Sequence, residues 1–223
     1  TCGEDLGTVC SDESVKVVEV TPYRLETTYS DNRHPDQVMW SKNLADDLAR
    51  RDFTVNAMAY NPVTREIVDL YGGQEDMYNK LIRAVGDADM RFGEDALRLM
   101  RAIRFMSQLD FDIDSVTRES IEKNAALLKN ISRERVKDEF VKLVMTDFPM
   151  RGLIMMKETG LLEYVVPELL RGVGVSQNQA HSFDVWEHNL RTLQHSADKK
   201  WPLHVRLSAI FHDISKPETR RFS

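Results

Sequence analysis

Asp95 and Arg98 are the two residues whose types and spacing offer the most specific chemistry in this sequence. On a continuous helix over 93–108, residues three apart point the same way, so this pair would place a carboxylate beside a forked guanidinium. The pairing edges of cytosine and adenine carry an amine donor next to a ring-nitrogen acceptor, whereas uracil and guanine present the reverse order. The pair therefore predicts a protein template that accepts C and A and rejects U and G.

An ordinary surface role is the alternative for the same helix. Glu94 and Asp95 precede Arg98 by four and three residues, spacings at which exposed ion pairs contribute roughly 0.2–0.5 kcal/mol. Arg101, three residues further on, is expected to orient Asp95 or Arg98, or to form a structural pair near Glu94. Arg104 leaves this face of the helix and is expected to be structural.

A second stretch with chemical potential is Arg50-Arg51-Asp52-Phe53-Thr54-Val55-Asn56-Ala57. Arg51 offers a cation for phosphate, and Asp52 offers a carboxylate that can accept a ribose hydroxyl proton. The alternative is a solvated helix end whose arginines form ion pairs with nearby aspartates.

The bulk composition limits the class of protein. The 223 residues carry a net charge of −6, so contact with nucleic acid would require local basic patches rather than a basic surface overall. Two cysteines, Cys2 and Cys10, are too few for a disulfide framework, which fits a reducing cytoplasm. No apolar run approaches the ~20 residues of a membrane span, and no signal peptide is evident. We expect an internal piece of a longer, cytoplasmic protein.

Hydrophobic periodicity and turn residues predict a mixed first part and a helical remainder. A strand is expected over 14–24, a helix N-capped by Ser41, and a strand near 67–70 that ends in a turn at Gly72-Gly73. The segment 171–180 is the best candidate for a linker. The expected helices after this first part are 74–80, 93–108, 115–128, 132–145, 148–158, 160–171, 183–197 and 202–214. The fold class is α+β.

Several of these stretches together resemble one family. Residues 50–57 match the RRDFTxNA signature of class II tRNA nucleotidyltransferases, the CCA-adding enzymes and their bacterial poly(A) polymerase relatives. Residues 68–73 (VDLYGG) are similar to the family's turn, 81–87 (LIRAVGD) to its LIRAVGD element, and 94–98 (EDALR) to its EDxxR nucleotide template. Residues 29–35 resemble the flexible loop of the head domain. The resemblance runs in order from about residue 7 to residue 170.

This resemblance implies an architecture and an activity. We expect the remnant of a polymerase β-type nucleotidyltransferase head over 1–86, a helical neck that binds nucleotide and RNA over 87–172, and the start of an HD-type helical domain over 173–223. The implied activity is template-independent addition of CMP and AMP from CTP and ATP to the tRNA 3′ end. The implied nucleotide-binding residues are Arg51, Asp52, Asn56, Asp95, Arg98 and Arg101, with Asn56 supporting the geometry of its block.

Metal ions are expected to act in this reaction. Two-metal phosphoryl transfer needs closely spaced carboxylates that hold Mg²⁺. The family's aspartate pair lies in a block that is expected upstream of Thr1. Glu19, on the expected strand, stands where a further catalytic carboxylate of the head would fall.

The C-terminal part carries a second candidate metal site. His188, together with the neighbouring residues His212 and Asp213, resembles the start of an HD-domain site, and imidazole and carboxylate suit Mn, Ni, Fe or Zn. Ser215 replaces the usual glycine of the HDxGK motif, so a vestigial or incomplete site is an equal alternative. His181 is a weaker candidate for the same site.

Three other functions remain open from the sequence. A poly(A) polymerase or a specialised A-adding or C-adding enzyme would share the same motifs. An HD-type phosphohydrolase acting on RNA or nucleotides, with the neck as its RNA platform, belongs to a different class. A catalytically inactive RNA-binding piece is the third possibility. The oligomeric state is not predicted.

Overall fold

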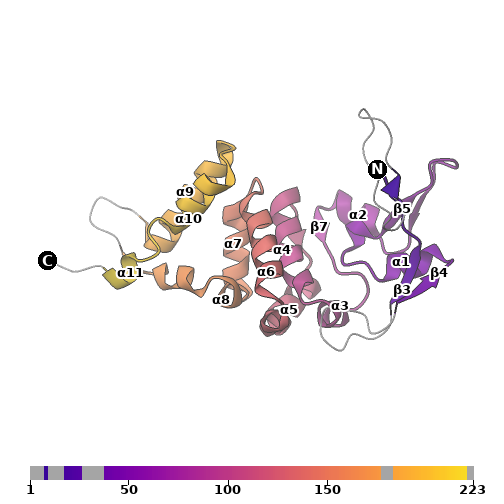
Figure 1. Ribbon diagram of the computed structural model, residues 1–223, viewed down its shortest axis with the longest axis horizontal. Helices are drawn as coiled ribbons and strands as arrows, with labels where there is room; N and C mark the ends of the chain where they lie inside the picture. The colour runs from indigo at the N-terminus through magenta and orange to yellow at the C-terminus, as the bar shows by residue number, and fades with distance from the viewer. Residues whose placement is uncertain (1–7, 10–17, 27–37, 177–182, 220–223) are drawn as a thin grey trace.

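The computed structural model of the chain describes residues 8–9, 18–26, 38–176 and 183–219. The elements follow one another along the long axis of the molecule, with the strands at one end and the last helices at the other (Figure 1). This order confirms the α+β prediction, because short strands dominate before residue 70 and helices dominate after it. No described helix is long and apolar enough to cross a membrane.

The strands form small antiparallel pairs in the first part of the chain. β1 (Thr8–Val9) pairs with β2 (Val18–Glu19), β3 (Tyr23–Glu26) with β4 (Val38–Ser41), and β5 (Met58–Tyr60) with β6 (Ile67–Asp69). Part of the strand expected over 14–24 is therefore present. Ser41 closes β4 instead of capping the next helix, because the Asn43 side chain caps α1 (Leu44–Ala49) by accepting a hydrogen bond from Ala45 N at 3.1 Å.

The segment that follows α1 is fixed by backbone pairing with a distant part of the chain. Phe53 forms a bridge with Ala84, and Thr54 N donates to Arg83 O at 2.9 Å. Val85 N completes the pairing by donating to Asp52 O at 3.0 Å. The pairing and the short helix η1 (Thr54–Asn56) set the direction of residues 51–56.

Two glycines are required where β6 turns into α2 (Gly73–Tyr78). Gly72 adopts a left-handed conformation with φ +75°, which strains residues that carry a Cβ. A Cβ on Gly73 would lie only 2.3 Å from the carbonyl oxygen of Thr54, so α2 can approach η1 only with glycine there. Asp69 caps α2 by accepting hydrogen bonds from the N–H groups of Gly73 and Gln74, which is consistent with the predicted turn.

The continuous helix expected over 93–108 is broken, and this corrects the prediction. α3 (Ala88–Glu94) ends at Asp95, whose backbone is extended at φ −140° and ψ 102°, and α4 (Leu97–Leu109) begins two residues later. The Asp95 carboxylate accepts a hydrogen bond from Leu97 N at 3.1 Å, so the aspartate caps a new helix instead of continuing the old one. Asp95 and Arg98 consequently do not share a helix face.

The neck helices pack around one hydrophobic core. α4 packs against α6 (Arg133–Val144) and α7 (Pro149–Glu158), side by side in Figure 1. The expected helix 115–128 is α5 (Ser115–Asn124) followed by a 3₁₀ turn over Ala125–Asn130. The expected helix 160–171 is split into α8 (Leu162–Val165) and a 3₁₀ segment over Pro167–Gly172, since a proline inside a helix lacks the required N–H. A short parallel pair, β7 (Leu81–Ile82) and β8 (Asp112–Ile113), joins the two parts.

The last helices are joined to the neck by a buried arginine. α9 (Val185–Asp198) and α10 (Leu203–Phe211) pack together, and the short α11 (Lys216–Thr219) follows. Arg206 on α10 is only 2% exposed and donates to the carbonyl oxygens of Val144 at 3.0 Å and Thr146 at 2.7 Å, where α6 ends. It also donates to Trp201 O at 3.0 Å. One buried guanidinium thus satisfies carbonyls from two parts of the chain.

We predict that Arg206→Met lowers the free energy of unfolding by roughly 2–5 kcal/mol, because the substitution leaves several buried carbonyl groups without donors. The measurement is urea denaturation. Arg118→Met is the matched control, since the half-buried Arg118 forms surface ion pairs with Glu122 and Glu158 and its loss should cost less than about 1 kcal/mol. Equal losses in the two variants would contradict the linking role of Arg206.

Candidate functional site

One pocket is lined by polar residues from two sequence stretches, 50–57 and 95–101, in which the sequence predicts the nucleotide-binding residues. It has a volume of about 550 Å³ and lies between the segment that follows α1, the start of α4 and the first turn of α6. Its walls include every residue that was expected to bind nucleotide. The lining residues are Arg50, Arg51, Asp52, Asn56, Asp95, Leu97, Arg98, Arg101, Phe105 and Arg135. The sequence prediction missed four of these, namely Arg50, Leu97, Phe105 and Arg135.

Asp47 fixes the two arginines on one side of the pocket. Its carboxylate accepts hydrogen bonds from Arg50 Nη2 at 2.6 Å and from Arg51 Nη2 at 3.2 Å. Burial acts to raise the pKa of Asp47, but the hydrogen bonds and charges of these arginines outweigh burial and lower the pKa below its usual value. Arg51 keeps 44% of its side chain exposed, so its guanidinium is still accessible from the pocket.

Asp52 is held by donors on both carboxylate oxygens. Oδ1 accepts from Phe53 N at 2.9 Å and from the Asn56 amide at 3.0 Å. Oδ2 accepts from Arg101 Nε at 2.8 Å and Nη2 at 2.6 Å. The four acceptor positions of the carboxylate are therefore all used, and a ribose hydroxyl reaches Asp52 only by displacing one of these donors.

Arg101 contacts Asp52 and not the partners that the sequence suggested. Its expected contacts with Asp95, Arg98 or the surroundings of Glu94 are not formed, because the start of α4 lies against the segment that contains Asp52. Three N–H groups of Arg101 have no acceptor among the described residues. The guanidinium lies over the ring of Phe105, with 5.3 Å to the ring centroid. Arg101 can thus offer donors to a ligand while Asp52 holds it.

Some N–H groups of Arg98 donate to protein acceptors, which fixes the side chain, and others have no acceptor in the described parts of the chain. Its Nη1 donates to Glu94 Oε2 at 2.6 Å and to Arg91 O at 3.1 Å, and its Nη2 donates to Arg50 O at 3.0 Å. The side chain is 11% exposed. Nε–H and one Nη2–H remain without an acceptor in the described parts of the chain. The Glu94–Arg98 pair expected at i,i+4 is present, while no direct Asp95–Arg98 ion pair occurs.

Asp95 reaches the same pocket from the junction of α3 and α4. Oδ1 accepts from Leu97 N at 3.1 Å, and Oδ2 accepts from Arg135 Nη2 at 2.8 Å. Two of its roughly four acceptor positions thus stay available to a ligand. Asp95 and Arg98 are therefore brought to one pocket by the break between two helices, and not by helical periodicity.

Arg104 and Glu19 are two further residues to which the sequence assigned a role. Arg104 donates to Glu139 Oε2 at 2.7 Å and turns away from the pocket, which agrees with its expected structural role. Glu19 lies on β2, opposite Thr8. The side chain of Glu19 lies outside the described residues, and its catalytic role stays a prediction.

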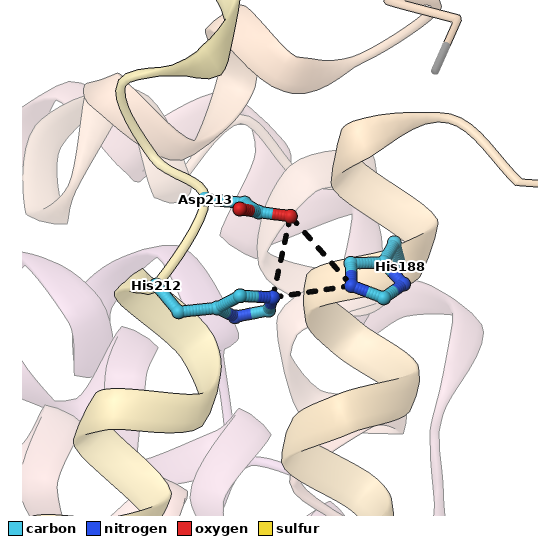
Figure 2. A group of neighbouring side chains, drawn as sticks. All are labelled: His188, His212 and Asp213. Atoms are coloured by element: carbon cyan, nitrogen blue, oxygen red, sulfur yellow. Dashed lines mark hydrogen bonds and ion pairs between the residues drawn. The ribbon is translucent and has the colours of Figure 1, made fainter. Parts of the chain in front are cut away.

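A second cluster of polar side chains lies between α9 and the end of α10. His188 Nε2 and His212 Nε2 are 3.1 Å apart, and Asp213 Oδ2 lies 3.6 Å from the first and 3.2 Å from the second (Figure 2). These are the three predicted metal ligands, and the structure brings them together. His181, the weaker candidate, lies outside the described residues.

Two of the three distances between these ligand atoms match the spacing around a bound cation, and the 3.6 Å between His188 Nε2 and Asp213 Oδ2 is slightly wider. Donors ~2.1 Å from one ion and separated by ~90–110° lie ~3.0–3.4 Å apart. His212 Nδ1 is 2.8 Å from Ala209 O, and this hydrogen bond leaves Nε2 as the metal-facing atom. Lys216 Nζ lies 2.5 Å from Asp213 Oδ2, so a cation would share that carboxylate with an ammonium group.

Comparison with known proteins identifies relatives of both parts of the chain. The family described as "Poly A polymerase head domain" matches residues 1–83. The family described as "Probable RNA and SrmB-binding site of polymerase A" matches residues 110–171. The two matches lie on either side of α3 and α4, and the pocket-lining residues Asp95, Leu97, Arg98, Arg101 and Phe105 fall between them.

Curated relatives are CCA-adding enzymes. The chain is 48% identical to the enzyme of Pediococcus pentosaceus over 162 residues, which cover 73% of this chain and 41% of the relative. It is 53% identical to the enzyme of Lactobacillus helveticus over 125 residues, which cover 56% of this chain and 31% of the relative. The chain therefore spans less than half the length of these relatives.

Solved structures similar to this chain are also CCA-adding enzymes and tRNA nucleotidyltransferases. The Bacillus stearothermophilus CCA-adding enzyme in complex with CTP superimposes with a TM-score of 0.66 and 33% identity, over 93% of this chain and 53% of that one. A tRNA nucleotidyltransferase complexed with a primer tRNA and an incoming ATP analogue has a TM-score of 0.59 and 26% identity, over 76% of this chain and 50% of that one.

Proposed function

This chain belongs to the family of class II tRNA nucleotidyltransferases and bacterial poly(A) polymerases, and on that premise we propose that the protein containing it adds CMP and AMP to the 3′ end of tRNA. The observation that carries the proposal is the pocket in which Asp95 and Arg98 retain unused acceptor and donor positions. CTP and ATP are the substrates, and the tRNA 3′ hydroxyl is the acceptor.

Base selection follows from the chemistry of this pair. The exocyclic amine of cytosine or adenine donates to Asp95, and the adjacent ring nitrogen accepts from Arg98. Uracil and guanine would place a carbonyl oxygen against the carboxylate and an N–H against the guanidinium. Because such mismatches leave polar groups unpaired in a pocket, they can reduce kcat/KM by several powers of ten.

The other residues that line the pocket can bind the ribose and the triphosphate, which all four nucleotides share. Arg51 and the unpaired N–H groups of Arg101 offer charge-assisted hydrogen bonds to phosphate or ribose oxygens. Asn56 and Asp52 hold Arg101 in place. We propose that these residues bind sugar and triphosphate without distinguishing between bases.

Divalent metal, Mg²⁺ in our proposal, supplies charge that holds the triphosphate and lowers the pKa of the attacking hydroxyl. Glu19 is our candidate for one carboxylate near that centre. We also propose domain boundaries at 1–86, 87–172 and 173–223. The Asp52–Arg101 ion pair spans the first of these boundaries, so the pocket belongs to head and neck together.

We predict that Arg98→Ala in the full-length protein lowers the preference for CTP and ATP over UTP and GTP. The expected loss is ~1–3 kcal/mol, the value of one charged hydrogen bond, and it should fall on CTP and ATP alone. The measurement is kcat/KM for each of the four nucleoside triphosphates with a tRNA that lacks its 3′ end.

Arg51→Ala is the matched control for this experiment. It should lower kcat/KM for all four nucleoside triphosphates by the same factor, because phosphate and sugar do not differ between them. If Arg98→Ala also lowered kcat/KM for all four by the same factor, Arg98 would be structural or would bind phosphate. Sequencing of the products would separate CCA addition from the addition of A alone, C alone or poly(A).

A second candidate activity rests on the cluster of His188, His212 and Asp213. We propose that these residues hold a transition metal, since their ligand atoms all lie within 4.8 Å of one another and imidazole and carboxylate suit such an ion. A metal held there would supply activated water for hydrolysis of a phosphate ester on RNA or a nucleotide. This activity would be independent of the nucleotide pocket.

We predict that His212→Ala abolishes Mn²⁺ or Ni²⁺ binding by the full-length protein and leaves nucleotide addition nearly unchanged. The metal content of the dialysed protein and phosphatase activity are the measurements. His204→Ala is the control, because His204 is exposed on the same helix and lies outside the cluster. Equal metal content in His212→Ala and the parent protein would mean that the cluster is structural.

A further inference from the structure

Arg135 links α6 to the carboxylate that we propose reads the base. It lies in the first turn of α6, forty residues beyond Asp95, and its Nη2 donates to Asp95 Oδ2 at 2.8 Å. Both side chains are mostly buried in the wall of the nucleotide pocket. The family motifs around Asp95 gave no sign of this contact, because it comes from a distant helix.

Asp95 depends on this contact for its orientation. Its backbone is extended and belongs to neither α3 nor α4. Leu97 N contacts Oδ1, and the only side chain donating to this carboxylate among the described residues is Arg135. Without the guanidinium, the carboxylate could rotate about its hydrogen bond to Leu97 N, and its unused acceptor positions would lose their direction.

The packing of α6 against α4 does not require Arg135. Glu139, one turn further along α6, binds Arg104 of α4 at 2.7 Å and is almost completely buried. Arg135 Nη1, in contrast, is buried without a hydrogen-bond partner in the described part of the chain. An arginine that served only to join the helices would be expected to have its donors paired. The geometry therefore favours a role for Arg135 through Asp95.

We infer that Arg135 is a positioning residue that determines base specificity by holding Asp95 toward the exocyclic amine of the incoming nucleotide. This inference rests on the proposed base template. Cytosine and adenine need a directed acceptor at that position, whereas uracil and guanine make no favourable contact with Asp95. Loss of Arg135 consequently lowers the use of CTP and ATP without affecting UTP and GTP.

The test compares kcat/KM of the full-length protein for the four nucleoside triphosphates. Arg135→Met should lower the values for CTP and ATP by about 10- to 100-fold, the effect of misplacing a reacting contact by ~1 Å, and leave UTP and GTP unchanged. Arg135→Lys should recover part of the preference, because lysine still offers one charged donor. Arg133→Met is the matched control, since Arg133 lies in the same turn and contacts Tyr164 O instead of Asp95.

A double-mutant cycle separates positioning from a structural effect. In an Asp95→Ala background, Arg135→Met should not change the nucleotide preference further, because no side-chain acceptor for Arg135 is left at that position. The preference is a ratio and does not depend on the fraction of active protein, so it remains informative if Arg135→Met is less stable.

Two outcomes would overturn the inference. One is a common loss for all four nucleotides in Arg135→Met, and the other is an additive effect in the double mutant. A parent protein that shows no preference for CTP and ATP would instead refute the proposed base template itself. The same data set therefore distinguishes failure of the inference from failure of the proposed function.

Discussion

The ion pair between Asp52 and Arg101 is the interaction on which the candidate site depends. Asp52 follows α1 in the part of the chain that contains the strands, and Arg101 lies on α4 in the helical part. Backbone pairing of residues 52–54 with 83–85 fixes the first segment, and the buried core fixes α4. The ion pair joins residues 52–54 to α4, and the pocket lies between them.

The pocket combines rigid groups with unused hydrogen-bonding positions. Arg98 is fixed by Glu94 and two carbonyl groups, and Asp95 by Leu97 N and Arg135, yet each keeps positions for a ligand. Groups that are already oriented lose little conformational entropy on binding, and they reject a mismatched base because they cannot turn to accommodate it. Fixation by the protein thus explains how side chains could replace a nucleic-acid template.

The sequence identified most of the site but not its geometry. Asp95 and Arg98 were selected as an i,i+3 pair, and both line the pocket, although Asp95 in fact caps the helix that carries Arg98. Helical periodicity alone could not show this break, because an aspartate can either continue a helix or cap a new one. Arg135 gave no local signal, since its contact with Asp95 arises from the packing of α6 beside α4. The three metal-ligand candidates came together as predicted from their motif.

The most direct measurement of base reading by side chains is the binding of a modified substrate. The dissociation constants of CTP and of 3-deaza-CTP, which lacks the ring-nitrogen acceptor, would be compared in the full-length protein and in its Arg98→Ala variant. We expect the modified nucleotide to bind the parent protein about tenfold more weakly than CTP, a difference of ~1.4 kcal/mol. Arg98→Ala should bind the two equally. Equal binding of the two nucleotides by the parent protein would contradict the account.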